Sequence, residues 1–307
     1  MTEARPDATA PSSSLAGIGI VLLSALLIAL APNAAKIAYR EGADLTAVIT
    51  FRTLIGAAGL ALYLAARRHW PPGGRDAFRR SAFSGLAQVF TALGFIGAVA
   101  FIDVSLAALI FYSHPFLVAL ISHLRGEARM SANRFVWIAS AIAGLALVFG
   151  LKLASLAPLG IALSLGGMVA VTVLIFTVAG LSAEVGPIPA NLFMTTWSCL
   201  YLLAFALAAP LTGLAAPMTL PGSVTGWIAI LGAGVTTTTG YVLFFVGARI
   251  VGTARAAVWT VTEPLFAIIF AVLLIGETLS ASQWLGVAIV IGSLIRFETT
   301  VAPAPRD

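Results

Sequence analysis

Long apolar runs separated by short polar links cover almost the whole chain. Most of the runs reach the roughly 20 apolar residues that a helix needs to cross a bilayer, and the links carry the glycines, prolines and charges that end helices. The pattern predicts ten transmembrane helices, at residues 15–40, 44–66, 78–101, 104–124, 132–151, 156–182, 188–210, 224–248, 253–275 and 281–297. We therefore predict an all-α integral membrane protein in which short links make consecutive helices antiparallel neighbours.

One motif occurs twice, about half a chain length apart. His114-Pro115 leads through an apolar run to Gly126-Glu127, and Glu263-Pro264 leads through a similar run to Gly276-Glu277. Such a repeat indicates a duplicated fold with five helices in each half. Because five is odd, the second half enters the membrane in the opposite orientation, as inverted repeats do in secondary transporters.

The repeat divides the chain into four parts. We predict a first five-helix repeat at residues 15–151 and a second at 156–297. Residues 1–14 are polar and rich in Pro, Ala and Ser, and we expect them to form a disordered cytoplasmic N-terminus. Residues 298–307 form a cytoplasmic tail.

Composition excludes a soluble protein. Hydrophobic residues make up 60% of the chain and charged residues 9%, and the mean hydropathy is +1.04. A soluble domain carries roughly 25% charged residues, so this chain has too few to cover a surface that faces water. The partner that the composition predicts is the lipid bilayer.

The net charge of +5 reflects topology rather than nucleic-acid binding. With the N-terminus placed in the cytoplasm, cytoplasmic segments hold all but four of the 17 arginines and lysines; the exceptions are Lys36, Arg40, Arg52 and Lys152. Basic residues favour the cytoplasmic side of short loops. We therefore place both termini in the cytoplasm.

The sequence offers no catalytic or metal-binding set. Cys199 is the single cysteine, which rules out an intramolecular disulfide, and no Cys/His cluster has zinc-ligand spacing. We find no nucleophile with its base, and the links are too short to hold a separate domain. We predict that the protein is not an enzyme and uses no cofactor or metal. A non-transporting membrane scaffold is a remaining alternative.

The paired Gly-Glu turns, the ten-helix pattern and the small residues before each proline motif resemble the EamA family of the drug/metabolite transporter superfamily. The turns read Gly-Glu-x-x-x-Ser from Gly126 and Gly-Glu-x-Leu-Ser from Gly276, so the second matches the family spacing and the first has one extra residue. The resemblance covers residues 15–297. It implies a secondary transporter of small metabolites such as amino acids in a bacterial inner membrane. Export is expected, and import of a metabolite or vitamin-like solute is the alternative. Its expected mechanism is alternating access around a midplane cavity.

Glu263 and His114 are the first candidates for the site. Each precedes a proline near the middle of a predicted helix, where an ionisable group is costly to insert and is often functional. We expect them to couple transport to protons or to bind a cationic group, since a histidine can exchange a proton near neutral pH. The alternatives are a Glu263 carboxyl that caps backbone groups freed by Pro264 and a His114 that only forms structural hydrogen bonds.

Arg52 and Lys36 are candidates for binding an anionic group of the solute. Both lie in the outer half of the membrane in the predicted topology, where a guanidinium or ammonium can pair with a carboxylate or phosphate. The alternative for Lys36 is snorkelling to the interface. The alternative for Arg52 is a structural ion pair with Glu41, Asp44 or Asp103.

Polar and aromatic residues within predicted helices complete the candidate set. We expect those near the motifs to line a cavity for an amphipathic solute, with helix packing as the alternative for each. They are Asn33, Gln88, Tyr112, Trp259 and Tyr241, with Ser113 and Trp197 in the same group. Small-residue pairs, Ser140 with Gly144 and Ala288 with Gly292, predict close packing between the fifth and tenth helices.

Overall fold

Helices account for all regular structure in the computed structural model of the protein, which describes residues 11–68, 74–99, 101–102, 104–127, 130–150, 157–213, 216–270 and 279–300. The helices are α1 (Pro11–Arg40), α2 (Leu45–Ala66), α3 (Gly74–Val99), α4 (Val104–Phe111), α5 (His114–Leu124), α6 (Ala132–Phe149), α7 (Pro158–Val185), α8 (Pro187–Leu211), α9 (Val224–Val251), α10 (Thr253–Trp259), the 3₁₀-helix η1 (Thr260–Thr262), α11 (Glu263–Phe270) and α12 (Ala281–Thr299). The prediction of an all-α protein is confirmed for these residues.

Most observed boundaries lie within a few residues of the predicted ones. Helix α1 starts at Pro11, inside the segment that we predicted to be disordered. The two helices predicted at 104–124 and 253–275 are each broken, the first after Phe111 and the second at η1. The turn at Gly276-Glu277, the predicted boundary at 152–155 and the ends of both chain tails lie outside the described residues.

Six helical segments are long and apolar enough to cross a membrane, judged by length and composition. They are Leu15–Arg40, Leu45–Ala66, Ala107–Leu124, Pro158–Val185, Pro187–Leu211 and Val224–Val251. Two shorter helices, Ala132–Val148 and Ala281–Phe297, are also apolar. Many large apolar side chains point outward, such as Leu207 at 72% exposed, as expected for a surface that faces lipid.

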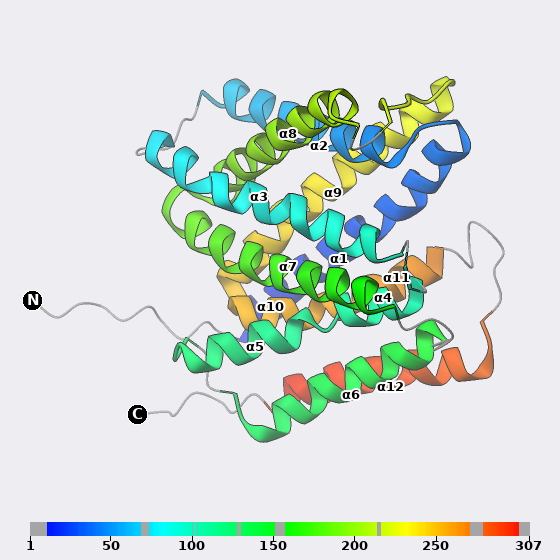
Figure 1. Cartoon of the computed structure of the whole chain (residues 1–307). Helices are drawn as coiled ribbons and strands as arrows, with labels where there is room; N and C mark the ends of the chain where they lie inside the picture. Colours follow the sequence, from blue (N-terminus) through cyan, green and yellow to red (C-terminus); the bar gives the residue numbers. More distant parts are fainter. Residues whose placement is uncertain are drawn as a thin grey trace, which may run out of the picture.

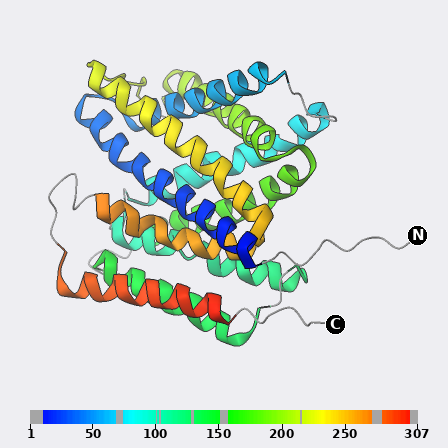
Figure 2. The same ribbon diagram turned by 180° about the vertical axis from the view of Figure 1, so that it is seen from behind.

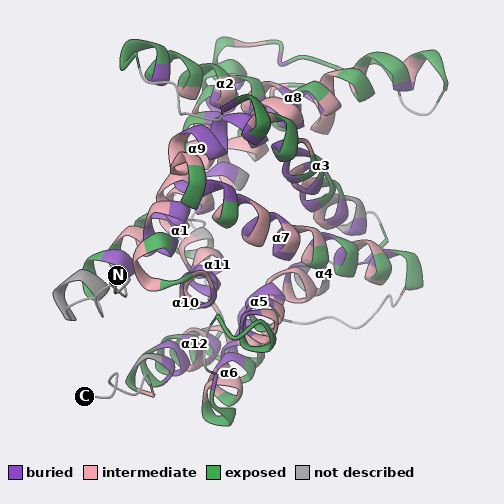
Figure 3. Cartoon of the chain, turned by 90° about the vertical axis from the view of Figure 1, so that its left-hand side faces the viewer, coloured by how far each residue is buried: buried purple, intermediate pink, exposed green. Residues whose placement is uncertain are grey.

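The helices form a layered bundle (Figure 1). Helices α2 and α8 lie at one side of the molecule and the α6–α12 pair at the opposite side, with the other helices between them. Figure 3 shows that buried residues gather on the inward faces and exposed residues on the outer faces. Seen from behind, the start of α1 and the end of α12 lie on the same side of the molecule (Figure 2).

Contacts between the two halves of the chain are reciprocal. Helix α1 of the first half packs along α9 of the second, and α7 of the second packs along α3 of the first. Likewise α2 packs against α9 and α8 against α3, while α2 with α8 and α6 with α12 are pairs of equivalent helices. Helices α5 and α10, which also pack together, belong to the equivalent fourth and ninth predicted helices. This reciprocity is the arrangement that a two-fold pseudo-symmetry produces.

Close packing of α6 on α12 rests on glycines. At Gly286 an added Cβ would lie 2.6 Å from the Gly144 carbonyl oxygen and 2.7 Å from the Val148 nitrogen. The Ser293 hydroxyl donates to Ser140 Oγ at 2.9 Å across the same contact. The predicted packing of the fifth and tenth helices is confirmed, but the glycine of α12 in the contact is Gly286. Gly292 faces open space.

Replacing Gly286 with valine is expected to destabilise the protein by about 1–3 kcal/mol, because the new side chain meets backbone atoms that cannot move away. The measurement is the midpoint of unfolding of the purified protein as a denaturing detergent is added. Gly292→Val is the matched control, since nothing lies within 4 Å of an added Cβ there. Equal midpoints for the two variants would contradict the close contact.

Candidate functional site

The two broken helices meet each other in the interior. The first break, at Tyr112 and Ser113, separates α4 from α5, and the second, at η1, separates α10 from α11. Each break is followed within two residues by proline, Pro115 or Pro264, which removes a backbone donor and prevents a regular helix through that point. Because α5 packs against α10, the two breaks face each other.

A hydrogen bond joins the two breaks directly. The Tyr112 hydroxyl donates to Glu263 Oε1 at 2.8 Å. Glu263 is partly buried as the first residue of α11, and a carboxylate accepts a stronger hydrogen bond than a neutral acceptor does. The structure therefore brings together two of the predicted site residues, one from each half of the chain. The alternative role for the Glu263 carboxyl was to cap backbone groups freed by Pro264. The carboxyl instead accepts a hydrogen bond from a side chain of the other half.

His114 makes the second bridge between the breaks and also caps one of them. Its side chain is buried, with Nδ1 3.1 Å from the Phe111 carbonyl oxygen and Nε2 3.3 Å from Thr260 Oγ1. Phe111 stands four residues before Pro115, so its carbonyl lacks the usual helical donor. Since a carbonyl only accepts, Nδ1 carries a proton and Nε2 is the ring atom that can gain or lose one.

Thr260 is a site residue that the sequence reasoning missed. Its hydroxyl donates to the Ala257 carbonyl at 2.7 Å and faces His114 Nε2. A hydroxyl can rotate to donate to Nε2 or accept from it, so Thr260 is compatible with either protonation state of the ring. A signal was present in the repeat, because Thr260 stands as far before Pro264 as Phe111 does before Pro115.

Hydroxyl side chains bond back to the backbone at equivalent places in both breaks. The Ser113 hydroxyl donates to the Leu109 carbonyl at 2.8 Å, and the Thr262 hydroxyl donates to the Trp259 carbonyl at 2.7 Å. Such bonds satisfy carbonyls that an interrupted helix leaves without a partner. The Ser113 side chain thus provides a hydrogen-bond donor for the backbone at the break.

Tyr241 of α9 connects the Glu263 region to Arg52 of α2. Its hydroxyl interacts electrostatically with both the Arg52 guanidinium and the Glu263 carboxyl. Arg52 also interacts in this way with Tyr39 of α1. Arg52 of the first half and Glu263 of the second half therefore both lie within electrostatic range of one tyrosine inside the bundle.

Arg52 does not form the structural ion pair that we considered as its alternative role. Among the described residues it pairs with neither Glu41 nor Asp44. The Asp44 carboxylate instead caps α2, accepting from the Ala47 amide at 2.7 Å and the Thr219 amide at 2.9 Å. Asp103 lies outside the described residues. The guanidinium remains a candidate for binding an anionic group.

The other predicted site residues are less closely tied to the breaks. Asn33 donates to the Ala29 carbonyl of its own helix at 3.3 Å. Gln88 has a buried Oε1 without a hydrogen-bond partner among the described residues. Trp259 packs against both large apolar clusters, which favours packing as its role, and the side chain of Lys36 lies outside the described part.

Trp197 makes packing contacts at the interface between α8 and α3. Its indole N–H donates to the Phe78 carbonyl at 2.8 Å, and its ring stacks on those of Phe78 and Tyr201. The contacts with Phe78 join α8 to α3, whereas Tyr201 belongs to α8 itself. Across the described residues, no group of three or more His, Cys, Asp or Glu side chains is placed to hold a metal ion.

The Gly126-Glu127 turn of the first half is a helix cap. Gly126 ends α5 with φ +72°, and the Glu127 amide donates back to the Ser122 carbonyl at 3.0 Å. This is the left-handed helix cap that glycine favours. Glu127 pairs with Arg125 at 3.6 Å on the surface, so this turn is structural.

Comparison with known families identifies the fold type. The EamA-like transporter family matches the chain twice, over residues 15–150 and 158–297. The chain belongs to the EamA-like transporter family. This confirms the resemblance drawn from the Gly-Glu turns and the repeat, and it makes the chain a multi-pass membrane protein of a transporter family whose partner is a small-molecule solute.

The fold is shared with a solved structure. A chain known only as "Crystal structure of protein" superposes with a TM-score of 0.73 and 18% sequence identity, covering 94% of this chain and 98% of that chain. At this identity the likeness concerns the fold alone. None of the curated proteins compared with the chain matches it.

Proposed function

We propose that this EamA-like protein is a secondary transporter that exports small metabolites, with amino acids as the favoured class. The observation that carries the proposal is the Tyr112–Glu263 hydrogen bond, which joins the two halves where both helices break. In transporters with repeated halves, discontinuous helices near the midplane form the site for solute and coupling ion. A solute that binds Glu263, or a proton that neutralises it, can replace this hydrogen bond between the two halves.

Proton coupling is the proposed driving mechanism. Glu263 changes charge when it binds a proton, and the strength of its bond from Tyr112 changes with that charge. His114 Nε2 and the Thr260 hydroxyl form a neighbouring pair that can also exchange a proton. We propose that protonation loosens the contact between the breaks and biases the two halves toward the opposite conformation.

Amino acids are favoured because the site holds groups of both signs. A zwitterion presents an ammonium and a carboxylate together, and Glu263 and Arg52 are matched to these charges. Both lie within electrostatic range of Tyr241. The Tyr241 hydroxyl can accept from an ammonium or donate to a carboxylate.

Topology completes the proposal. We propose ten transmembrane helices in two inverted repeats, 15–151 and 156–297, in a bacterial inner membrane. The reciprocal contacts between the halves support the inverted arrangement. Both chain ends are proposed to be cytoplasmic, which agrees with the arginine distribution and with the placement of the start of α1 and the end of α12 on one side (Figure 2).

Reconstituted protein is expected to move amino acids across a membrane when a proton gradient is imposed. The test loads proteoliposomes with single labelled amino acids, sets the gradient in each direction, and measures flux against protein-free liposomes. A set of other metabolites tests the breadth of the substrate range. Absence of flux for every solute and every gradient would overturn the proposed function.

A further inference from the structure

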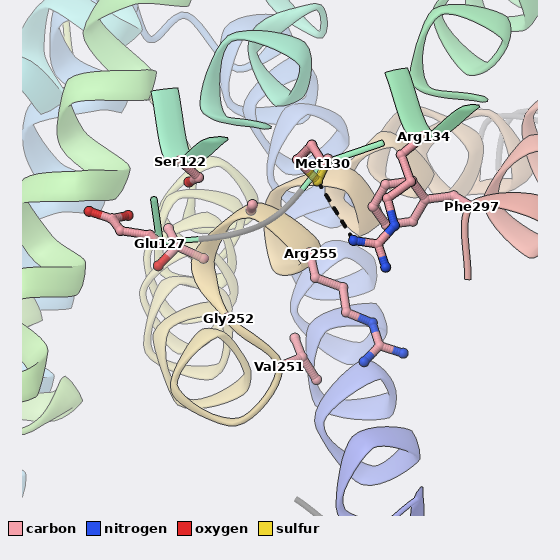
Figure 4. Close-up of a pocket in the computed structure, with 10 residues that line it drawn as sticks. Ser122, Glu127, Met130, Arg134, Val251, Gly252, Arg255 and Phe297 are labelled. Atoms are coloured by element: carbon pink, nitrogen blue, oxygen red, sulfur yellow. Dashed lines mark hydrogen bonds between the residues drawn. The ribbon is translucent and has the colours of Figure 1, made fainter. Parts of the chain in front are cut away.

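A pocket of about 410 Å³ opens where the two halves of the chain meet, away from the helix breaks. The first half supplies Ser122 at the end of α5, Glu127 in the following link and Arg134 of α6. The second half supplies Arg255 of α10 and Phe297 of α12. Figure 4 shows these side chains around the pocket.

The described lining of the pocket holds more basic than acidic side chains. Arg134 and Arg255 carry the two positive charges of the lining, and the guanidinium of Arg134 lies 3.9 Å from the Met130 sulfur and 5.6 Å from the centre of the Phe297 ring. The acid in the lining, Glu127, is paired with Arg125 at 3.6 Å, and its carboxylate points away from both guanidinium groups (Figure 4).

Ser122 provides an independent indication of a ligand. It is 1% exposed and lines the pocket, and its Oγ has no hydrogen-bond partner among the described residues. A buried hydroxyl left without a partner is rare, because it loses its bonds to water without replacing them. A ligand oxygen in the pocket would accept the hydrogen bond that Ser122 can donate.

We infer that this pocket binds a phosphate-bearing anion. Arginine forks match the oxygens of a phosphate group in geometry and charge, and the volume exceeds that of a bare ion, leaving room for the group to which the phosphate is attached. The pocket lies at the arginine-rich side of the protein, where the headgroups of anionic lipids gather near basic residues. The ligand is therefore the phosphate of a membrane lipid or of a soluble phosphate ester.

Binding at this place couples the ligand to the conformation. The pocket is formed by residues of both halves, so an anion within it holds α5 and α6 against α10 and α12. A ligand that binds one conformation more tightly shifts the population toward it. The anion is thus expected to stabilise the conformation seen here and to raise the temperature at which it unfolds.

The test measures binding to the purified full-length protein with three probes: inorganic phosphate, glycerol 3-phosphate, and nanodiscs that contain phosphatidylglycerol in place of part of their phosphatidylcholine. The readouts are calorimetric affinity for the soluble probes and thermal unfolding in the two kinds of nanodisc. Arg255→Gln is expected to weaken binding about tenfold, the effect of losing one charge-assisted hydrogen bond. Ser122→Ala, which changes few atoms, is expected to weaken it by a smaller factor.

Arg249→Gln is the matched control, because it removes the same charge from the end of α9 at a residue that does not line the pocket. Binding of glycerol 3-phosphate or phosphate that falls in Arg255→Gln but not in Arg249→Gln supports a soluble ligand. Stabilisation by phosphatidylglycerol alone, lost in the same variant, supports a lipid. No binding in either arm, or equal loss in both arginine variants, overturns the inference.

Discussion

Replacing Glu263 with glutamine is expected to reduce transport driven by a proton gradient at least about tenfold, while the protein still folds and inserts. Glutamine keeps the size of the side chain and an oxygen that can accept from Tyr112, so the bond between the two breaks can still form. What it loses is the ability to bind and release a proton, which an ionisable group inside a membrane protein commonly provides.

Two measurements distinguish a loss of proton coupling from a general loss of transport. Flux under a proton gradient is compared with exchange of labelled for unlabelled solute at equal pH, which needs no net proton movement. Loss of the first with retention of the second supports coupling at Glu263. Glu41→Gln is the matched control, because Glu41 lies in the link after α1 and accepts from Gly222 through its backbone carbonyl. Unchanged gradient-driven flux in Glu263→Gln would contradict the coupling role.

The second large effect is expected at Arg52. Replacing it with glutamine should weaken the apparent affinity for an amino acid by roughly tenfold to a hundredfold, because one charge-assisted hydrogen bond to a carboxylate is lost. The effect should fall on affinity more than on the maximum rate, since Arg52 is proposed to hold the solute rather than the proton. The measurement is the concentration dependence of uptake into proteoliposomes.

Solute chemistry provides the sharper comparison for Arg52. The corresponding amine without a carboxylate should be handled equally by Arg52→Gln and by the unchanged protein, because it cannot use the guanidinium. Arg79→Gln removes a charge from an exposed position on α3 and should behave like the unchanged protein. If carboxylate and amine solutes lose the same affinity in Arg52→Gln, a carboxylate role for Arg52 is wrong.

The helix breaks show how much of the structure the local sequence predicts. Proline removes a backbone donor and can interrupt a helix, but the length of the apolar runs predicted unbroken helices at residues 104–124 and 253–275. The structure breaks both helices next to the prolines. The sequence did not predict which side chains satisfy the freed backbone groups. His114 bonds to the Phe111 carbonyl of its own half, whereas Glu263 accepts from Tyr112 of the other half.

Arg52 and Trp197 show why single side chains are harder to assign. Ion pairing of Arg52 with a neighbour in the first half was plausible from proximity along the chain, but Asp44 is engaged in capping α2. Trp197 is amphipathic and suited to a cavity, yet its N–H reaches the Phe78 carbonyl on an adjacent helix. In both cases the outcome depends on contacts between helices distant in sequence.

Hydrophobic periodicity, arginine placement and the repeated proline motif determined from sequence alone that the protein is helical, belongs in a membrane and is duplicated. These properties follow from the cost of exposing apolar surface to water and from local backbone geometry, both of which act on short segments. Only the tertiary structure decided that the two breaks meet, that Tyr112 reaches Glu263, and that Arg134 and Arg255 share a pocket. Such contacts join residues more than a hundred positions apart, and they are set by how whole helices pack.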